Sequence, residues 1–216
     1  MNKKLISLVL SLILVFSVSA AFAADSPSLS PNLSPSQSPS NSPTINADAV
    51  VSTLNVALPA DFLATIPQSG DASEEELAFA NDLLSQIESF ISTNGLSVVE
   101  FFGFDVQAAI SEKLPSDMAA SDLVLRELFA LPLNDMAAAY DPAYGDIVLP
   151  MSFPVAFNEG DTVVPMLGIA DAATQEVTWI ALDAVVNAEG LVEITFTEDV
   201  FAQIDETDIT VMAILA

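Results

Sequence analysis

Residues 191–197 read Leu-Val-Glu-Ile-Thr-Phe-Thr, so apolar and polar side chains alternate along the stretch. A period of two places Val192, Ile194 and Phe196 on one face of a β-strand and the polar side chains on the other. The stretch therefore predicts a strand with one buried and one solvated face. Residues 187–190, Asn-Ala-Glu-Gly, come directly before it and are typical of a hairpin loop, because glycine readily adopts a positive φ.

Further short segments around this strand are rich in Val, Ile, Leu and Phe, and they lie near 122–131, 145–153, 161–170, 176–186 and 208–215. Two stretches within them, 163–170 and 209–215, are apolar on both faces, which predicts central strands that are covered on both sides. The leucine spacing of 122–131 also fits a helix. Taken together, the segments predict a mainly antiparallel β-sandwich over residues 120–216.

The region before residue 120 is predicted to be helical. Ser73 and Glu76 form a capping-box pattern, apolar residues follow at helical spacing, and Asn94-Gly95 is a typical stop, which predicts a helix over 73–93. Ser97 with Glu100 repeats the capping pattern. A further short helix is expected from Asp105 to Lys113, before Pro115. These elements make up a small helical lobe over residues 46–119.

The first residues of the chain have the pattern of an export signal. Lys3 and Lys4 precede an apolar run from Leu5 to Ser19, and Ala21-Phe22-Ala23 offers small residues at both recognition positions, so we expect a signal peptide over 1–23. The run is shorter than the roughly 20 residues that span a bilayer, which argues against stable membrane insertion. A disordered Ser-Pro spacer is expected over 24–45, since proline recurs there every fourth residue. We expect the protein to be extracellular, and the sequence does not decide whether it is associated with the cell surface.

The whole chain is thus expected to be an α+β protein: signal peptide, Ser-Pro spacer, helical lobe and β-sandwich. Its composition limits its chemistry, because it has no histidine and no cysteine. Disulfides, Ser-His-Asp and Cys-His catalysis, and zinc sites built on His or Cys all need those residues. Lys113 and Arg126 are the basic residues that remain after signal removal, against 30 Asp and Glu. Such a surface repels phosphate backbones, so nucleic acid is excluded as a partner.

Carboxylates are the remaining side chains that could catalyse a reaction or bind a metal ion. A pair of them could hydrolyse glycosides, with one acid protonated and the other ionised. Oxygen-rich loops could also hold calcium. The candidate calcium ligands are Asn158, Glu159 and Asp161, because Gly160 permits a tight turn that brings them together. Two further acidic loops, 141–146 and 205–208, offer similar side chains, and for all three loops the alternative is a solvated turn without an ion. No organic cofactor is expected.

Several features of the last third of the chain are found together in a known type of module. They resemble small β-sandwich modules at the C-termini of exported Gram-positive cell-surface proteins. The features are the 158–161 turn before an apolar strand, the Val-Thr-Trp of 177–179, the Asn-x-x-Gly turn and the 191–196 strand. The resemblance spans residues 145–216 and implies an extracellular module with a structural or adhesive task. The resemblance identifies no catalytic residues in this chain.

The sequence therefore favours a secreted, non-catalytic binding, adhesion or envelope-associated module, whose extracellular or cell-envelope partner it does not identify. The alternative is a secreted carbohydrate-active enzyme that works through a carboxylate pair. A third hypothesis is a subunit that joins a larger assembly by strand addition at an unpaired sheet edge.

Overall fold

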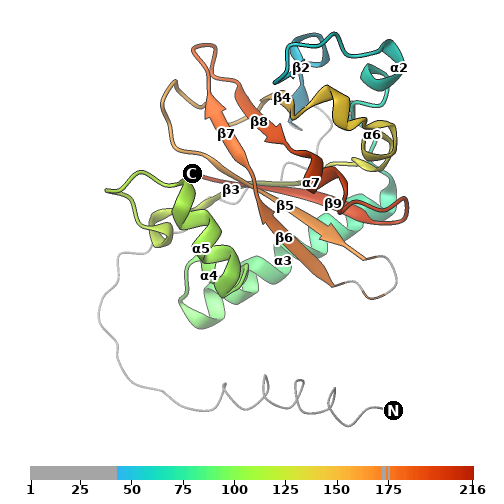
Figure 1. The fold of residues 1–216 in the computed structure, drawn as a ribbon. Coiled ribbons are helices and arrows are strands. Elements are labelled where there is room, and N and C mark those ends of the chain that lie inside the picture. Colours follow the sequence, from blue (N-terminus) through green and yellow to red (C-terminus); the bar gives the residue numbers. More distant parts are fainter. Residues whose placement is uncertain (1–42, 172–173, 175) are drawn as a thin grey trace, which may run out of the picture. The chain divides into compact units, whose positions relative to one another are not determined.

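The computed structural model describes residues 43–171, 174 and 176–216. The predicted signal peptide and the spacer up to residue 42 lie outside the described residues. The described part has helices and two antiparallel sheets that pack as a sandwich, as the sequence predicted in outline (Figure 1).

One sheet, here called sheet A, has the strand order β1-β4-β8-β7, with β2 also paired to β4. Its strands are β1 (Thr44–Ile45), β2 (Val51–Ser52), β4 (Ile147–Ser152), β7 (Asp183–Val186) and β8 (Val192–Phe196). The predicted hairpin joins β7 to β8, with Gly190 at a φ of 78°. Val192, Ile194 and Phe196 are fully buried, so the alternation in β8 is confirmed.

Sheet B has the order β3-β9-β5-β6. Its strands are β3 (Leu125–Ala130), β5 (Val164–Ala170), β6 (Val177–Ala181) and β9 (Ile209–Leu215). The two strands predicted to be apolar on both faces, β5 and β9, are indeed the central ones. Each alternates its side chains between two separate clusters, as Met212 and Ile214 belong to one core and Val211 and Ala213 to the other.

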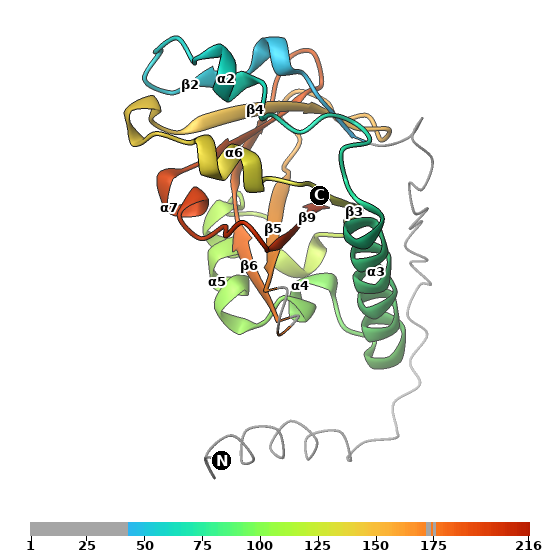
Figure 2. The same ribbon diagram turned by 90° about the vertical axis from the view of Figure 1, so that its right-hand side faces the viewer.

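Three helices cover the outer face of sheet B: α3 (Glu74–Asn94), α4 (Val98–Phe101) and α5 (Phe104–Lys113). The predicted capping box begins α3: the Ser73 N–H donates to Glu76 Oε2 at 2.6 Å, and the Glu76 N–H donates to Ser73 Oγ at 3.2 Å. Gly95 ends the helix in the left-handed region. Sheet A, sheet B and these helices therefore form three layers with two cores between them (Figure 2).

Short helical elements complete the core between the sheets. They are α2 (Ala60–Leu63), α6 (Asn134–Ala139), α7 (Glu198–Phe201) and the single turns η1 (Ala47–Ala49) and η3 (Pro142–Tyr144). A further turn, η2 (Ala120–Asp122), packs instead with α4 and α5 in the other core. Each of the three short α-helices buries a large side chain in the core between the sheets: Phe62 of α2, Met136 of α6 and Phe201 of α7. Every helix in the described part is too short or too polar to cross a membrane.

The structure differs from the sequence prediction at several boundaries. The segment 122–131 is a strand, β3, and not the alternative helix. The segment 176–186 is two strands in different sheets, because the chain bends at the buried Leu182, whose N–H donates to the Pro165 carbonyl at 2.9 Å. Thr44–Ile45, expected in the spacer, pair with β4 as β1, and the expected helical lobe also contributes β2 to sheet A.

Candidate functional site

The two long sides of the sandwich are closed in different ways. On one side the chain runs from β6 in sheet B through Leu182 into β7 in sheet A, so backbone joins the sheets. On the opposite side the edge strands are β1 and β2 of sheet A, both paired to β4, and β3 of sheet B, and no strand of the described residues pairs with these further. This open side is where a groove forms.

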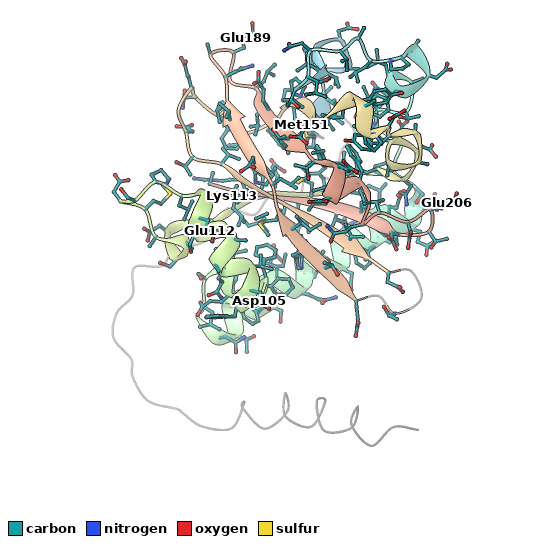
Figure 3. All side chains as sticks on the ribbon, viewed as in Figure 1. Asp105, Glu112, Lys113, Met151, Glu189 and Glu206 are labelled. Carbon is teal, nitrogen blue, oxygen red and sulfur yellow. The ribbon has the colours of Figure 1, made fainter. Side chains whose placement is uncertain are left out.

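The groove has a volume of about 340 Å³. Its walls come from β1, Met151 of β4, residues 128–132 at the end of β3, the loop 67–72 and the first turns of α3. Met151, labelled in Figure 3, is buried and belongs to the core between the sheets. Ile45 and Leu131 are also buried there, while Leu77 of α3 leaves 49% of its surface exposed at the rim. The groove is therefore apolar at its base and accessible at its mouth.

The polar part of the rim is held by its own hydrogen bonds. The Gln68 N–H donates to Asp71 Oδ2 at 2.6 Å, and the Asp71 N–H donates to the Gln68 carbonyl at 3.1 Å. The Gln68 side chain donates to the Ile66 carbonyl at 3.0 Å. These bonds fix the loop that leads into α3, so the rim of the groove is preformed.

The outer edge of β3 lies along the groove. Hydrogen-bonded residues alternate along an antiparallel ladder. The Leu131 N–H donates to the Thr210 carbonyl at 3.0 Å, so residues 127, 129 and 131 exchange bonds with β9. The backbone groups of Leu128 and Ala130 consequently face away from β9, towards the groove.

Glu127 is a buried carboxyl group that sequence reasoning missed. It lies on β3 with 7% of its surface exposed, paired with Ile214 on the face that looks towards sheet A. A β-bulge between Leu125 and Glu127 turns Arg126 outward and Glu127 inward. Burial raises the pKa of Glu127 above its ordinary value. The only signal in the sequence is one acid among leucines, which does not reveal the bulge.

The predicted calcium ligands lie together on one exposed turn between β4 and β5. The Asn158 N–H donates to Asp161 Oδ2 at 2.8 Å, and the Asp161 N–H donates to the Asn158 carbonyl at 2.9 Å. Asn158 Nδ2 is 3.3 Å from the same Asp161 oxygen. Glu159 is exposed at the tip of the turn. The turn therefore closes through its own groups, and calcium binding there stays a prediction.

The other two acidic loops are also closed by local hydrogen bonds. In 141–146, Asp141 Oδ1 accepts from the Ala143 N–H at 2.9 Å. In 205–208, Asp208 Oδ2 accepts from the Asp205 N–H at 2.8 Å, and Asn134 bridges both carbonyls. Within the described residues, no three acidic side chains converge in a way that could hold a metal ion.

The Tyr and Trp side chains are packed into the protein. Trp179 packs edge-to-face on Phe102 with ring centroids 4.6 Å apart, and Tyr140 stacks on Phe201 at 4.4 Å. Tyr144 packs on Phe62 at 5.2 Å. These rings are occupied by neighbours and do not form an open platform for a sugar.

Tyr140 has an acidic environment of its own. Its hydroxyl donates to the Gly145 carbonyl at 3.1 Å. Burial raises the pKa of Tyr140, and the negative charges of Glu198, Asp146 and Asp141 raise it further. The phenol is therefore protonated at neutral pH and acts as a hydrogen-bond donor.

The two basic residues outside the predicted signal have different roles. Lys113 Nζ lies 2.6 Å from Asp183 Oδ1, which links α5 in the helical layer to β7 in sheet A. Arg126 is exposed on the bulge of β3. Neither residue lines the groove.

Comparison of the chain with protein-family models, with curated proteins and with solved structures gave no match. The resemblance of residues 145–216 to β-sandwich modules of cell-surface proteins therefore stays a prediction.

Proposed function

We propose that this protein is a non-catalytic extracellular binding or adhesion module that uses the groove between β1 and β3 to hold its partner. The observation that carries the proposal is the make-up of this groove. It has a buried apolar base, an accessible mouth and a rim fixed by hydrogen bonds, which are common features of binding sites.

The groove offers little for carboxylate catalysis. None of the described residues that line it is Asp, Glu, Tyr or Trp. A glycosidase needs two carboxyl groups beside the bound sugar, about 5 to 10 Å apart. The tyrosines and the tryptophan, which would favour the enzyme if they lined a cleft, are packed against phenylalanines. These features support binding over the carbohydrate-active enzyme.

The charge of the protein suggests the kind of partner. Its net charge of −26 disfavours phosphate-rich and other anionic partners. In Figure 3 the labelled acidic side chains lie around the periphery: Asp105 and Glu112 on α5, Glu189 in the β7–β8 turn and Glu206 in the loop before β9. A cationic or neutral component of the cell envelope fits this surface best.

The proposal is tested by offering the purified secreted chain a panel of polysaccharides, peptides and esters, with and without calcium. We expect no turnover above that of the buffer. Reproducible hydrolysis that disappears when one Asp or Glu is changed to Ala, with an unchanged circular dichroism spectrum, would establish the enzyme instead. The matched control is a change of the exposed Glu206 to Ala, which should leave any trace activity unaffected.

A further inference from the structure

We propose that the groove receives one extended segment of a lysine-bearing partner, which adds as a strand to the outer edge of β3. This inference rests on the proposed binding function and specifies its partner. Strand addition takes its affinity from main-chain hydrogen bonds and its specificity from alternate side chains.

The edge of β3 has the donors and acceptors that strand addition needs. Leu128 and Ala130 turn their N–H and C=O groups away from β9, and no strand of the described residues pairs with them. At edge strand β7, Asp183 is already paired with Lys113. α3 contacts β3 and α5 contacts β6, in both cases from the helical layer on the outer face of sheet B.

The length of the docking edge is limited at both ends. The bulge between Leu125 and Glu127 interrupts the ladder at one end. Such bulges bend an edge strand and end regular pairing. At the other end Pro132 lines the groove and has no N–H to donate. The edge therefore accepts about five residues of extended chain.

The base of the groove determines the side-chain pattern of the partner. Ile45, Phe129 and Met151 lie on the side between the sheets, where they offer an apolar surface. An added strand points every second side chain towards that surface and the intervening ones towards solvent. The partner segment should therefore alternate apolar and polar residues.

Charge decides between a foreign partner and a second copy. The first turn of α3, next to the groove, carries Glu74, Glu75 and Glu76, and Asp71 lies in the adjoining loop. A second copy would bring another net charge of −26 to this face. Lysines that flank the apolar segment would instead lie against these carboxylates, so a cationic partner is favoured.

The test uses the full secreted chain and a synthetic peptide with a Val-Thr-Val-Thr-Val centre and two lysines on each side. Isothermal titration calorimetry at low salt should show saturable binding of one peptide per protein. Ala130→Pro removes one N–H from the docking edge and should weaken binding at least about tenfold. Ala184→Pro is the matched control. Ala184 lies on edge strand β7, and its backbone N–H likewise points away from the neighbouring strand, β8. This substitution should leave peptide affinity unchanged.

Amide hydrogen exchange gives a second measurement that does not depend on variants. In the protein alone, the N–H groups of Leu128 and Ala130 should exchange much faster than that of Phe129, and the peptide should slow them. Slow exchange of both without peptide would mean that the N-terminal part of the chain or a second copy already covers the edge, and would overturn the proposal. Absence of saturable binding would also overturn it. If the protein still binds intact cells in either case, only this inference fails; if it does not, the proposed function fails.

Discussion

Trp179 lies directly over Gly168, its register partner across β5 and β6. A Cβ atom on Gly168 would lie 2.8 Å from Cζ3 of the indole and 2.8 Å from Cγ2 of Val211. The other side of the indole packs on Phe102 of the helical layer. The absence of a side chain at residue 168 therefore lets the tryptophan join sheet B to the helices.

Gly168→Ala is expected to destabilise the protein, because the added methyl group overlaps the indole and a central strand cannot move away. Overpacking of this kind costs about 1 to 3 kcal/mol. Urea denaturation measures the change. In the background of Trp179→Leu, which removes the overlapping ring, the same substitution should cost clearly less, and an equal loss in both backgrounds would show that the ring is not the cause.

Glu127→Gln is expected to raise the free energy of unfolding at pH 7. The pKa of Glu127 is raised by burial, so the folded state binds its proton more tightly than the unfolded state does. The stability that this proton contributes is fully present below the unfolded pKa, and it is lost as the pH rises through the folded pKa. Glutamine cannot ionise, so it avoids that loss.

The two proteins should therefore differ in melting temperature at pH 7 and converge below about pH 4. Each kcal/mol of difference shifts the melting temperature by about 2 to 4 °C. Glu206→Gln, in an exposed loop, is the control for removing one charge. An equal gain in both variants would mean that net charge, and not the burial of Glu127, sets the effect.

Strands β5, β8 and β9 could be predicted from the sequence because their patterns are local. The alternation of β8 and the two-sided apolar character of β5 and β9 follow from burial, which a period of two reports directly. The capping residues of α3 act within one turn, so its beginning was also predictable.

The remaining elements depend on contacts between distant residues. β1 is only two residues long and is stabilised by Ser152 and Met151, far along the chain. No turn residue separates β6 from β7, so the change of sheet at Leu182 left no local signal. The short helix α6 was also missed, since its N-cap residue Leu133 makes no side-chain capping bond and Met136 is buried by the surrounding core. The groove depends on which strands lie at the edges, and that is a property of the whole topology.

The excess of negative charge is expected to make the protein more stable as the pH falls from 7 towards about 5. Negative charges repel one another more in the compact state than in the expanded chain, and protonation of carboxylates at lower pH relieves that repulsion. Added sodium chloride at pH 7 should stabilise the protein by screening this repulsion. Melting temperatures across this range measure both effects. A steady fall with decreasing pH would show that specific ion pairs or a bound cation dominate.

Calcium at the 158–161 turn can be tested by the same melting measurement. If Asn158, Glu159 and Asp161 bind the ion, the melting temperature rises with the concentration of calcium, and a chelator reverses the rise. Asp161→Asn should remove the calcium response. Asp208→Asn, in another acidic loop, should retain it. An unchanged melting temperature of the wild-type protein at millimolar calcium would refute the prediction.

The most direct measurement of the binding function is the equilibrium isotherm of the labelled, secreted chain on intact cells of the organism that produces it. We predict saturable retention that Leu77→Glu, at the rim of the groove, weakens at least about tenfold. Phe104→Glu should leave it unchanged, since that side chain is 83% exposed on α5 and lies outside the groove. Retention that is absent, or that rises linearly without saturation, would contradict the account.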